Sequence, residues 1–152
     1  MSTMGIVVLV VALVAAVLLV VGVILRYTMR VARTDGLAVI ESEFGDDLVL
    51  RSDPMANYFG FASHGAQQLR GNGALVLTPK MLWFKRFRTD LPLDLPLAAI
   101  RGVDIVDAHA GKRIGRPLLR VTFATDKGDD SVAWYVRDAE AWLATIEEVR
   151  AG

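Results

Sequence analysis

The chain has no cysteine and only two histidines among its 152 residues. The absence of cysteine excludes a disulfide framework, a thiolate nucleophile and any metal site built on thiolates. Asp107 and His109 would share one strand face, but such a pair supplies fewer ligands than protein metal sites use. Ser63 beside His64 lacks the glycine-flanked context of a hydrolase nucleophile. The sequence therefore predicts no enzyme activity, no cofactor and no metal.

An excess of charge of one sign is also lacking, because 17 basic residues balance 17 acidic ones. The two signs are separated along the sequence: residues 35–53 are mostly acidic, whereas residues 80–88 and 112–120 are basic and free of acids. The balanced charge, with aromatic residues better suited to a core, argues against nucleic-acid binding. The separation favours docking of one face of the domain onto a partner or surface.

A long apolar run is the strongest feature that the sequence contains. Gly5 to Leu25 is uncharged throughout, and a helix of this length spans roughly 31 Å, the thickness of a bilayer's hydrocarbon core. A cleaved signal peptide fits less well, because no Lys or Arg precedes the run and no small-residue cleavage site follows it. A buried helix of a soluble protein fits less well too, since the run is apolar all round. We expect residues 1–25 to be a short N-terminus and a transmembrane helix.

Basic residues follow this run directly. Arg26, Arg30 and Arg33 are spaced i, i+4, i+7 and share one face if the helix continues past the bilayer. Because cytoplasmic flanks are rich in Lys and Arg, we predict a single-pass cell-membrane protein with its N-terminus outside and its main domain in the cytoplasm. We expect residues 26–45 to be a basic juxtamembrane helix and then a connector, because acids and two glycines, Gly36 and Gly45, disfavour a continuous helix.

Residues 46–152 are enough for one compact domain and consist mainly of short strand patterns. Strands are predicted at 48–51, 74–78, 81–86, 91–97, 102–107, 118–125 and 131–137. Ser52-Asp53-Pro54 is predicted to end the first strand, residues 57–70 to be a loop that could end in a strand at 67–70, and Gly71-Asn72-Gly73 to be a hairpin turn. Prolines among the leucines of 91–97 indicate an edge strand.

A helix is predicted at the C-terminus. Asp138 is placed to cap it, and Trp142, Ile146 and Val149 follow at i, i+4, i+7, with Leu143 widening the apolar stripe. The predicted fold class is therefore mainly β with some α, with about seven strands and one closing helix that buries its stripe on the sheet.

Several of these segments, taken in order, resemble the GRAM and bacterial pleckstrin-homology-like superfamily. They are Arg70-Gly71-Asn72-Gly73-Ala74-Leu75-Val76-Leu77-Thr78, then Leu82-Trp83-Phe84, then Leu95-Pro96-Leu97-Ala98-Ala99-Ile100, and a late strand pair before a Trp-containing helix. The resemblance covers roughly residues 46–150. It implies a small β-barrel plugged by the C-terminal helix and a role in binding lipids or proteins at membranes, without catalysis. Such a fold does not identify the ligand.

Family members that bind phosphoinositides use a basic motif after the first strand, but residues 51–65 hold one Arg and no Lys, so no residue is carried over. Basic residues beside the apolar Phe87 and Ile114 offer another surface for anionic lipid or a partner. With the juxtamembrane arginines, the candidates are Arg26, Arg30, Arg33, Lys85, Arg86, Arg88, Lys112, Arg113 and Arg116.

Two functions remain open at this point. The first is a membrane-anchored module that contacts a protein partner at the bilayer surface, for example through an exposed sheet edge. The second is binding of an anionic lipid headgroup or a small apolar molecule by the domain. The lipid bilayer itself is a partner in both.

Overall fold

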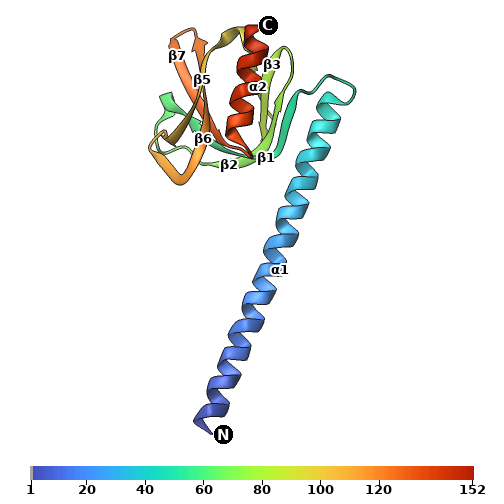
Figure 1. Cartoon of the computed structure of the whole chain (residues 1–152), viewed down its shortest axis with the longest axis vertical. Coiled ribbons are helices and arrows are strands. Elements are labelled where there is room, and N and C mark those ends of the chain that lie inside the picture. The colour runs from blue at the N-terminus through green and yellow to red at the C-terminus, as the bar shows by residue number, and fades with distance from the viewer. Residues whose placement is uncertain (1) are drawn as a thin grey trace. The chain divides into compact units, whose positions relative to one another are not determined.

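The computed structural model describes residues 2–152 and divides the chain into two compact units, with the boundary between Thr34 and Asp35. The elements in chain order (Figure 1) are α1 (Thr3–Phe44), β1 (Arg51–Phe61), η1 (Ala62–His64), β2 (Gly71–Leu77), β3 (Met81–Arg86), β4 (Leu93–Pro96), η2 (Leu97–Ala99), β5 (Ile100–His109), β6 (Lys112–Thr125), β7 (Gly128–Tyr135) and α2 (Ala139–Ala151).

Residues 3–34 of helix α1 lie in the first unit, and its last residues, 35–44, belong to the second. It is long and apolar enough to cross a membrane, with a mean hydropathy of 3.5 in its most apolar window and no residue of that window buried. The predicted apolar helix is therefore confirmed. The helix does not stop after the basic residues: it continues to Phe44, so the predicted connector before residue 45 is wrong.

Packing in the second unit explains why the helix continues. Val39, Ile40 and Phe44 cover a small apolar cluster on β2 and β3 that consists of Ala74, Val76 and Trp83. The Phe44 ring meets the Trp83 ring edge-on, with centroids 5.1 Å apart. Gly36 is buried, and a Cβ there would collide with the Pro54 carbonyl. The glycine thus permits α1 to approach β1 closely, and this packing outweighs the cost of about 1 kcal/mol that glycine brings to the interior of a helix.

The strands form one seven-stranded antiparallel sheet in the order β4-β3-β2-β1-β7-β6-β5. The predicted strand number is right, but the predicted barrel is not supported, because the edge strands β4 and β5 do not pair and the sheet stays open. Strand β4 is only four residues long and ends at Pro96. Proline has no N–H to donate to a further strand, which disfavours pairing beyond this edge.

The first part of the domain differs most from the sequence-based prediction. Strand β1 runs through Pro54 to Phe61, and the predicted loop at 57–70 is a loop only after that. The pairing register of β1 with β2 shifts between Asp53 and Ala56, and such a bulge accommodates a proline inside a strand. No strand forms at 67–70, and the predicted turn at 71–73 is the start of β2.

Helix α2 begins and packs as predicted. The Asp138 carboxylate accepts a hydrogen bond from the backbone N–H of Ala141 at 3.1 Å and caps the helix. Trp142 and Ile146 are buried in the main core, which also holds Trp134 and Phe84 on the inner face of the sheet. We use "inner face" for the side that carries this core and "outer face" for the other.

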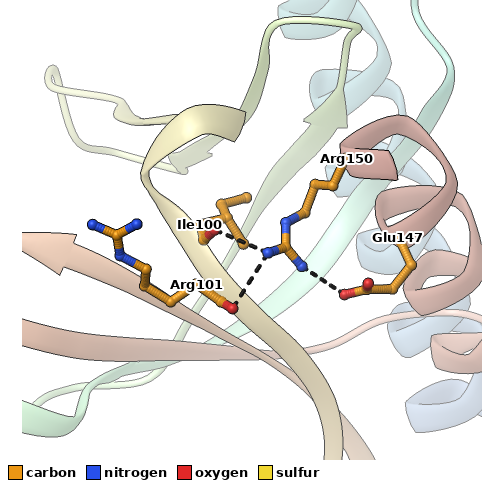
Figure 2. A network of polar contacts seen from close by, with 4 residues as sticks. All are labelled: Ile100, Arg101, Glu147 and Arg150. Carbon is orange, nitrogen blue, oxygen red and sulfur yellow. Dashed lines mark hydrogen bonds and ion pairs between the residues drawn. The ribbon is translucent and has the colours of Figure 1, made fainter. Parts of the chain in front are cut away.

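A polar network fixes the end of α2 to the edge of the sheet (Figure 2). The Arg150 guanidinium donates to the backbone carbonyls of Ile100 and Arg101 at 3.1 and 3.3 Å. It also pairs with Glu147 on its own helix at 2.7 Å. The first two carbonyls of β5 are therefore satisfied by a side chain instead of by another strand.

Candidate binding cleft

The inner face of the sheet ends in an open cleft of about 530 Å³. We call it the Tyr58 cleft. Its walls come from β1, β3 and β4 and from the connections at 62–70 and 87–92; the lining residues are Tyr58, Phe61, His64, Gln68, Leu69, Phe84, Arg86, Thr89, Leu91, Pro92 and Leu93. A concave site with mainly apolar walls and a few polar groups is the usual form of a binding site.

Aromatic rings form the floor of the Tyr58 cleft. Tyr58 stacks on Phe84 with centroids 5.3 Å apart and an interplanar angle of 17°, and it meets Phe61 edge-on at 6.1 Å. Gly73 makes room for this floor, because a Cβ there would lie 2.7 Å from two ring atoms of Phe84. Burial raises the pKa of Tyr58, an effect that Asp130 reinforces and Arg86 opposes. The phenol therefore stays neutral and offers a hydrogen-bonding group on an apolar floor.

Gln68 holds one wall of the cleft in place. Its side-chain oxygen accepts from the Phe61 N–H at 2.7 Å, and its amide nitrogen donates to the carbonyls of Phe61 and Gly65 at 2.6 and 2.8 Å. The amide thus satisfies the backbone of Phe61 as a neighbouring strand would. Gly60 lies against it with φ +96°, a conformation that favours glycine.

The cleft combines one cation with exposed apolar side chains at its rim. Arg86 donates only a long hydrogen bond, 3.5 Å, to the Leu69 carbonyl, and none of the ion pairs among residues 2–152 includes it. Leu69 and Leu91 are 79% and 86% exposed. Such a rim favours a ligand that brings both an apolar group and a negative charge.

The first predicted basic cluster is divided by the strand that carries it. Lys85 pairs with Glu43 of α1 at 3.9 Å, whereas Arg86 lines the Tyr58 cleft. Successive side chains of a strand point to opposite faces, which separates the two. Arg88 is exposed in the following turn with φ +63°. Of the three, only Arg86 belongs to the cleft.

The second predicted basic cluster lies on the outer face. The ammonium of Lys112 donates to the Phe59 carbonyl at 3.2 Å. The guanidinium of Arg116 donates to the Tyr135 hydroxyl at 2.9 Å and lies 5.4 Å from the centre of that ring. Arg113 is exposed. Ile114 packs on a small apolar cluster of the outer face, made of Phe59, Leu118 and Ala133, so it is not a free membrane-inserting side chain.

Arg70 belongs to this surface, although it is not among the candidates predicted from the sequence. Its guanidinium lies 5.2 Å from the centre of the Phe59 ring. Arg70, Lys112 and Arg116 are therefore three cations around one cluster, and none of them takes part in an ion pair among residues 2–152. No motif joins Arg70 to residues so far away in the sequence, which is why the pattern could not reveal its place on this surface. The other predicted arginines, Arg26, Arg30 and Arg33, are exposed on α1 in the first unit.

The histidines have structural surroundings. His109 is buried with its Nε2 3.0 Å from the Gly60 carbonyl oxygen, and burial lowers its pKa. Ser63 donates to Asp130 from its hydroxyl at 2.5 Å and from its backbone N–H at 3.0 Å. Burial alone would raise the pKa of Asp130, but these bonds and the Ser131 N–H lower it. Within residues 2–152 no group of three or more metal-ligating His, Asp or Glu side chains occurs.

Comparison with known proteins gives similarity of fold only. No family model and no curated protein matches this chain. One similar solved structure is the C-terminal domain of an unknown protein from Leishmania infantum, with a TM-score of 0.52, 14% identity and coverage of 76% of this chain and 97% of that one. Another, a chain of the 8S snRNP assembly intermediate, has a TM-score of 0.53, 9% identity and coverage of 68% and 82%. At these identities the chain shares a fold with both.

Proposed function

We propose that this chain is a single-pass, membrane-anchored interaction module without catalytic turnover, and that its domain contacts a protein partner at the membrane surface through the Tyr58 cleft. The proposal includes a relationship to pleckstrin-homology-like domains. Seven antiparallel strands followed by a C-terminal helix packed on the sheet support that relationship. The length and apolarity of α1 support the anchor.

The chemistry of the Tyr58 cleft carries the proposal. Its floor is aromatic, its rim has the exposed leucines Leu69 and Leu91, and Arg86 has no carboxylate partner in the described chain. An apolar side chain of the partner would fill the floor, and a carboxylate nearby would pair with the guanidinium. Tethering both proteins to one bilayer raises their effective concentration, so a small contact is sufficient.

Photo-crosslinking in intact membranes tests this contact. A photoreactive residue at Leu91 should give a discrete protein-sized adduct, whereas the same residue at Glu140, exposed on α2, should not. Arg86→Ala should remove the Leu91 adduct, because the ion pair is lost. An adduct of lipid size alone, or an adduct that survives Arg86→Ala unchanged, would contradict a protein partner at this site.

The orientation has its own test. Because the chain has no cysteine, a single one at Ser2 or at Lys127 can be labelled without background. The basic residues after the apolar run favour a cytoplasmic domain. In intact cells a membrane-impermeant maleimide should therefore modify Ser2→Cys and leave Lys127→Cys unmodified until the cells are permeabilised. The reverse pattern would place the domain outside.

Binding of anionic lipid is the second candidate, and the three cations of the outer face favour it. Arg70, Lys112 and Arg116 surround Phe59 and Tyr135 without a carboxylate partner in the described chain. A spin label on Arg113→Cys can report contact with the bilayer in nanodiscs that hold the full chain. Anionic lipid should raise its accessibility to oxygen, and Arg70→Glu with Arg116→Glu should cancel the rise. Equal accessibility in neutral and anionic discs would remove this function.

A further inference from the structure

We propose that a second copy of this chain binds along strand β5, so that two β5 strands pair antiparallel about a two-fold axis and join two sheets edge to edge. This interface is separate from the Tyr58 cleft and does not depend on the function proposed above. It requires a free sheet edge, a segment long enough to pair and side chains that complement themselves.

The two edges of the sheet differ in how they are protected. Strand β4 is short and ends at Pro96, which prevents further pairing. Strand β5 is ten residues long, contains neither proline nor lysine, and pairs with β6 on one side only. Short strands, prolines, bulges and charged side chains, lysine above all, are the usual means by which proteins block an edge. In β5 the register shifts and the exposed charges of Arg101 and Asp107 lie at the two ends of the strand, outside the segment from Gly102 to Val106.

The structure also limits which part of β5 can pair. At its start, Arg150 occupies the carbonyls of Ile100 and Arg101 (Figure 2). At its end, the register against β6 shifts between Val106 and Ala108, where the strand leaves its regular course. The segment between these limits runs from Gly102 to Val106, and its midpoint is Asp104. A two-fold axis that uses the whole segment therefore passes beside Asp104.

This register brings complementary side chains together. Val103 of one copy lies opposite Ile105 of the other, and both are apolar residues that border the main core. Just beyond each end of the paired segment, Arg101 of one copy would lie near Asp107 of the other, and both are exposed. The interface would thus have two apolar pairs within the paired segment and an opposite-charge pair just beyond each of its ends, and such pairs stabilise neighbouring antiparallel strands.

The residue on the axis is compatible with pairing. Asp104 would face Asp104, and like charges opposite each other are unfavourable. Each carboxylate, however, is held by two hydrogen bonds from Arg120 of its own chain, which offset its charge. The partner's Val106 would lie opposite Gly102, where an added Cβ would meet nothing within 4 Å, so the space for that side chain is open.

Disulfide trapping tests the axis directly. Residues directly opposite in an antiparallel pair have Cα atoms about 4.5–5.5 Å apart, which a disulfide can bridge. In the cysteine-free full chain, purified in detergent, Asp104→Cys should give at least about tenfold more oxidised dimer than Asp94→Cys, the exposed residue of the other edge. Equal crosslinking at the two edges would overturn the proposal.

A mixing experiment keeps the test valid if Asp104→Cys disturbs the fold by freeing Arg120. Gly102→Cys and Val106→Cys should crosslink to each other when the two proteins are mixed, and each should crosslink little on its own.

Charge reversal provides the second check. Arg101→Glu alone should weaken dimerisation about tenfold, since two ion pairs become repulsive, and adding Asp107→Arg should restore it. Failure of the mixed pair, or of the restoration, would contradict this register.

Discussion

The inner and outer faces of the sheet are stabilised in different ways. The inner face carries one large core that includes Trp134 and Trp142 beneath α2. The outer face carries two small clusters, one around Phe59 and one around Trp83. The inner core is formed by the sheet and the helix that follows it. Each outer cluster depends on a segment from elsewhere, either the end of α1 or the tip of the β5–β6 hairpin.

The outer cluster around Phe59 depends on contacts made by the tip of the β5–β6 hairpin. The hairpin tip reaches the outer face through Lys112 and His109, which bond to the carbonyls of Phe59 and Gly60. Gly115, with φ +69°, and Pro117 lie in the part of β6 where the pairing with β5 is interrupted. An interruption of this kind lets a strand bend, here towards the outer face. The outer face is thus held by two small buried clusters and by polar contacts such as these, whereas one large buried core holds the inner face.

The largest expected effect is in the inner core. Trp142→Ala leaves a cavity beneath α2 and should lower the free energy of unfolding by about 3–5 kcal/mol. Circular dichroism of the full chain in detergent, with added denaturant, measures this. Leu143→Ala, at a partly exposed position on the same helix, should have a clearly smaller effect. Equal losses would mean that α2 is not packed through Trp142.

The next effect concerns the end of α1. Gly36→Val places a side chain where a Cβ already collides with the Pro54 carbonyl, and the resulting overpacking should cost about 1–3 kcal/mol. Gly22→Val is the matched control, since a Cβ at Gly22 meets nothing within 4 Å. The control should leave domain stability unchanged. If both variants behaved alike, the packing of α1 against β1 would be refuted.

A pH effect should come from the hairpin tip. Burial lowers the pKa of His109 below its ordinary value of 6.5, so protonation favours the unfolded chain. Above about pH 6.5 the imidazole is neutral in both the folded and the unfolded chain, and the protein has its full stability. As the pH decreases towards the lowered pKa of the folded protein, the free energy of unfolding falls, by up to ~1.4 kcal/mol for each unit by which burial lowers that pKa. Thermal unfolding of the full chain between about pH 7.5 and about pH 5.5, above the range in which ordinary carboxylates titrate, would show this loss.

Substitution of each histidine in turn tests whether His109 causes this pH dependence of stability. His109→Gln should flatten the pH dependence, because glutamine can still donate to the Gly60 carbonyl and does not titrate. His64→Gln, at an exposed position, should leave the dependence in place. The opposite result would assign the effect to His64 and detach it from the hairpin tip.

The smallest expected effect is that of a single outer cation. Arg116→Ala removes a hydrogen bond and a contact with the Tyr135 ring, both at an exposed site, and should cost about 0.5–1 kcal/mol. Arg113→Ala, at a residue with no such contacts among residues 2–152, should cost less. Chemical denaturation of the two variants side by side measures the difference. A larger loss for Arg113→Ala would contradict the arrangement of this surface.

The C-terminal half of the fold could be predicted from the sequence because its signals are local. The spacing of Trp142 and Ile146 and the cap at Asp138 define α2 without reference to the rest of the chain. Strand β1 gave no such signal. It lies in the middle of the sheet and buries residues on both faces. Tyr58 lies on the inner face and Phe59 on the outer one. Polar and apolar residues therefore do not alternate along this strand.

Glycines caused the other errors. Gly71 and Gly73 suggested a turn, but they lie in a strand and make room for the side chains of Arg86 and Phe84 across it. Gly36 suggested the end of a helix, but it permits contact with Pro54. In each case the reason for the glycine lies in a neighbour distant in sequence. For the same reason the Tyr58 cleft, which joins β1, β3 and β4, could not be assembled from motifs.

Footprinting of exposed leucines tests the central claim, that the Tyr58 cleft is the contact surface for a partner in the membrane. Leu69, Leu91 and Leu48 are 79%, 86% and 65% exposed, and only the first two border the cleft. Hydroxyl-radical oxidation can be compared between the purified full chain in detergent and the chain in its native membranes. We expect protection of Leu69 and Leu91 in the native membranes and unchanged oxidation of Leu48. Equal oxidation of all three in both samples would contradict a contact at this cleft.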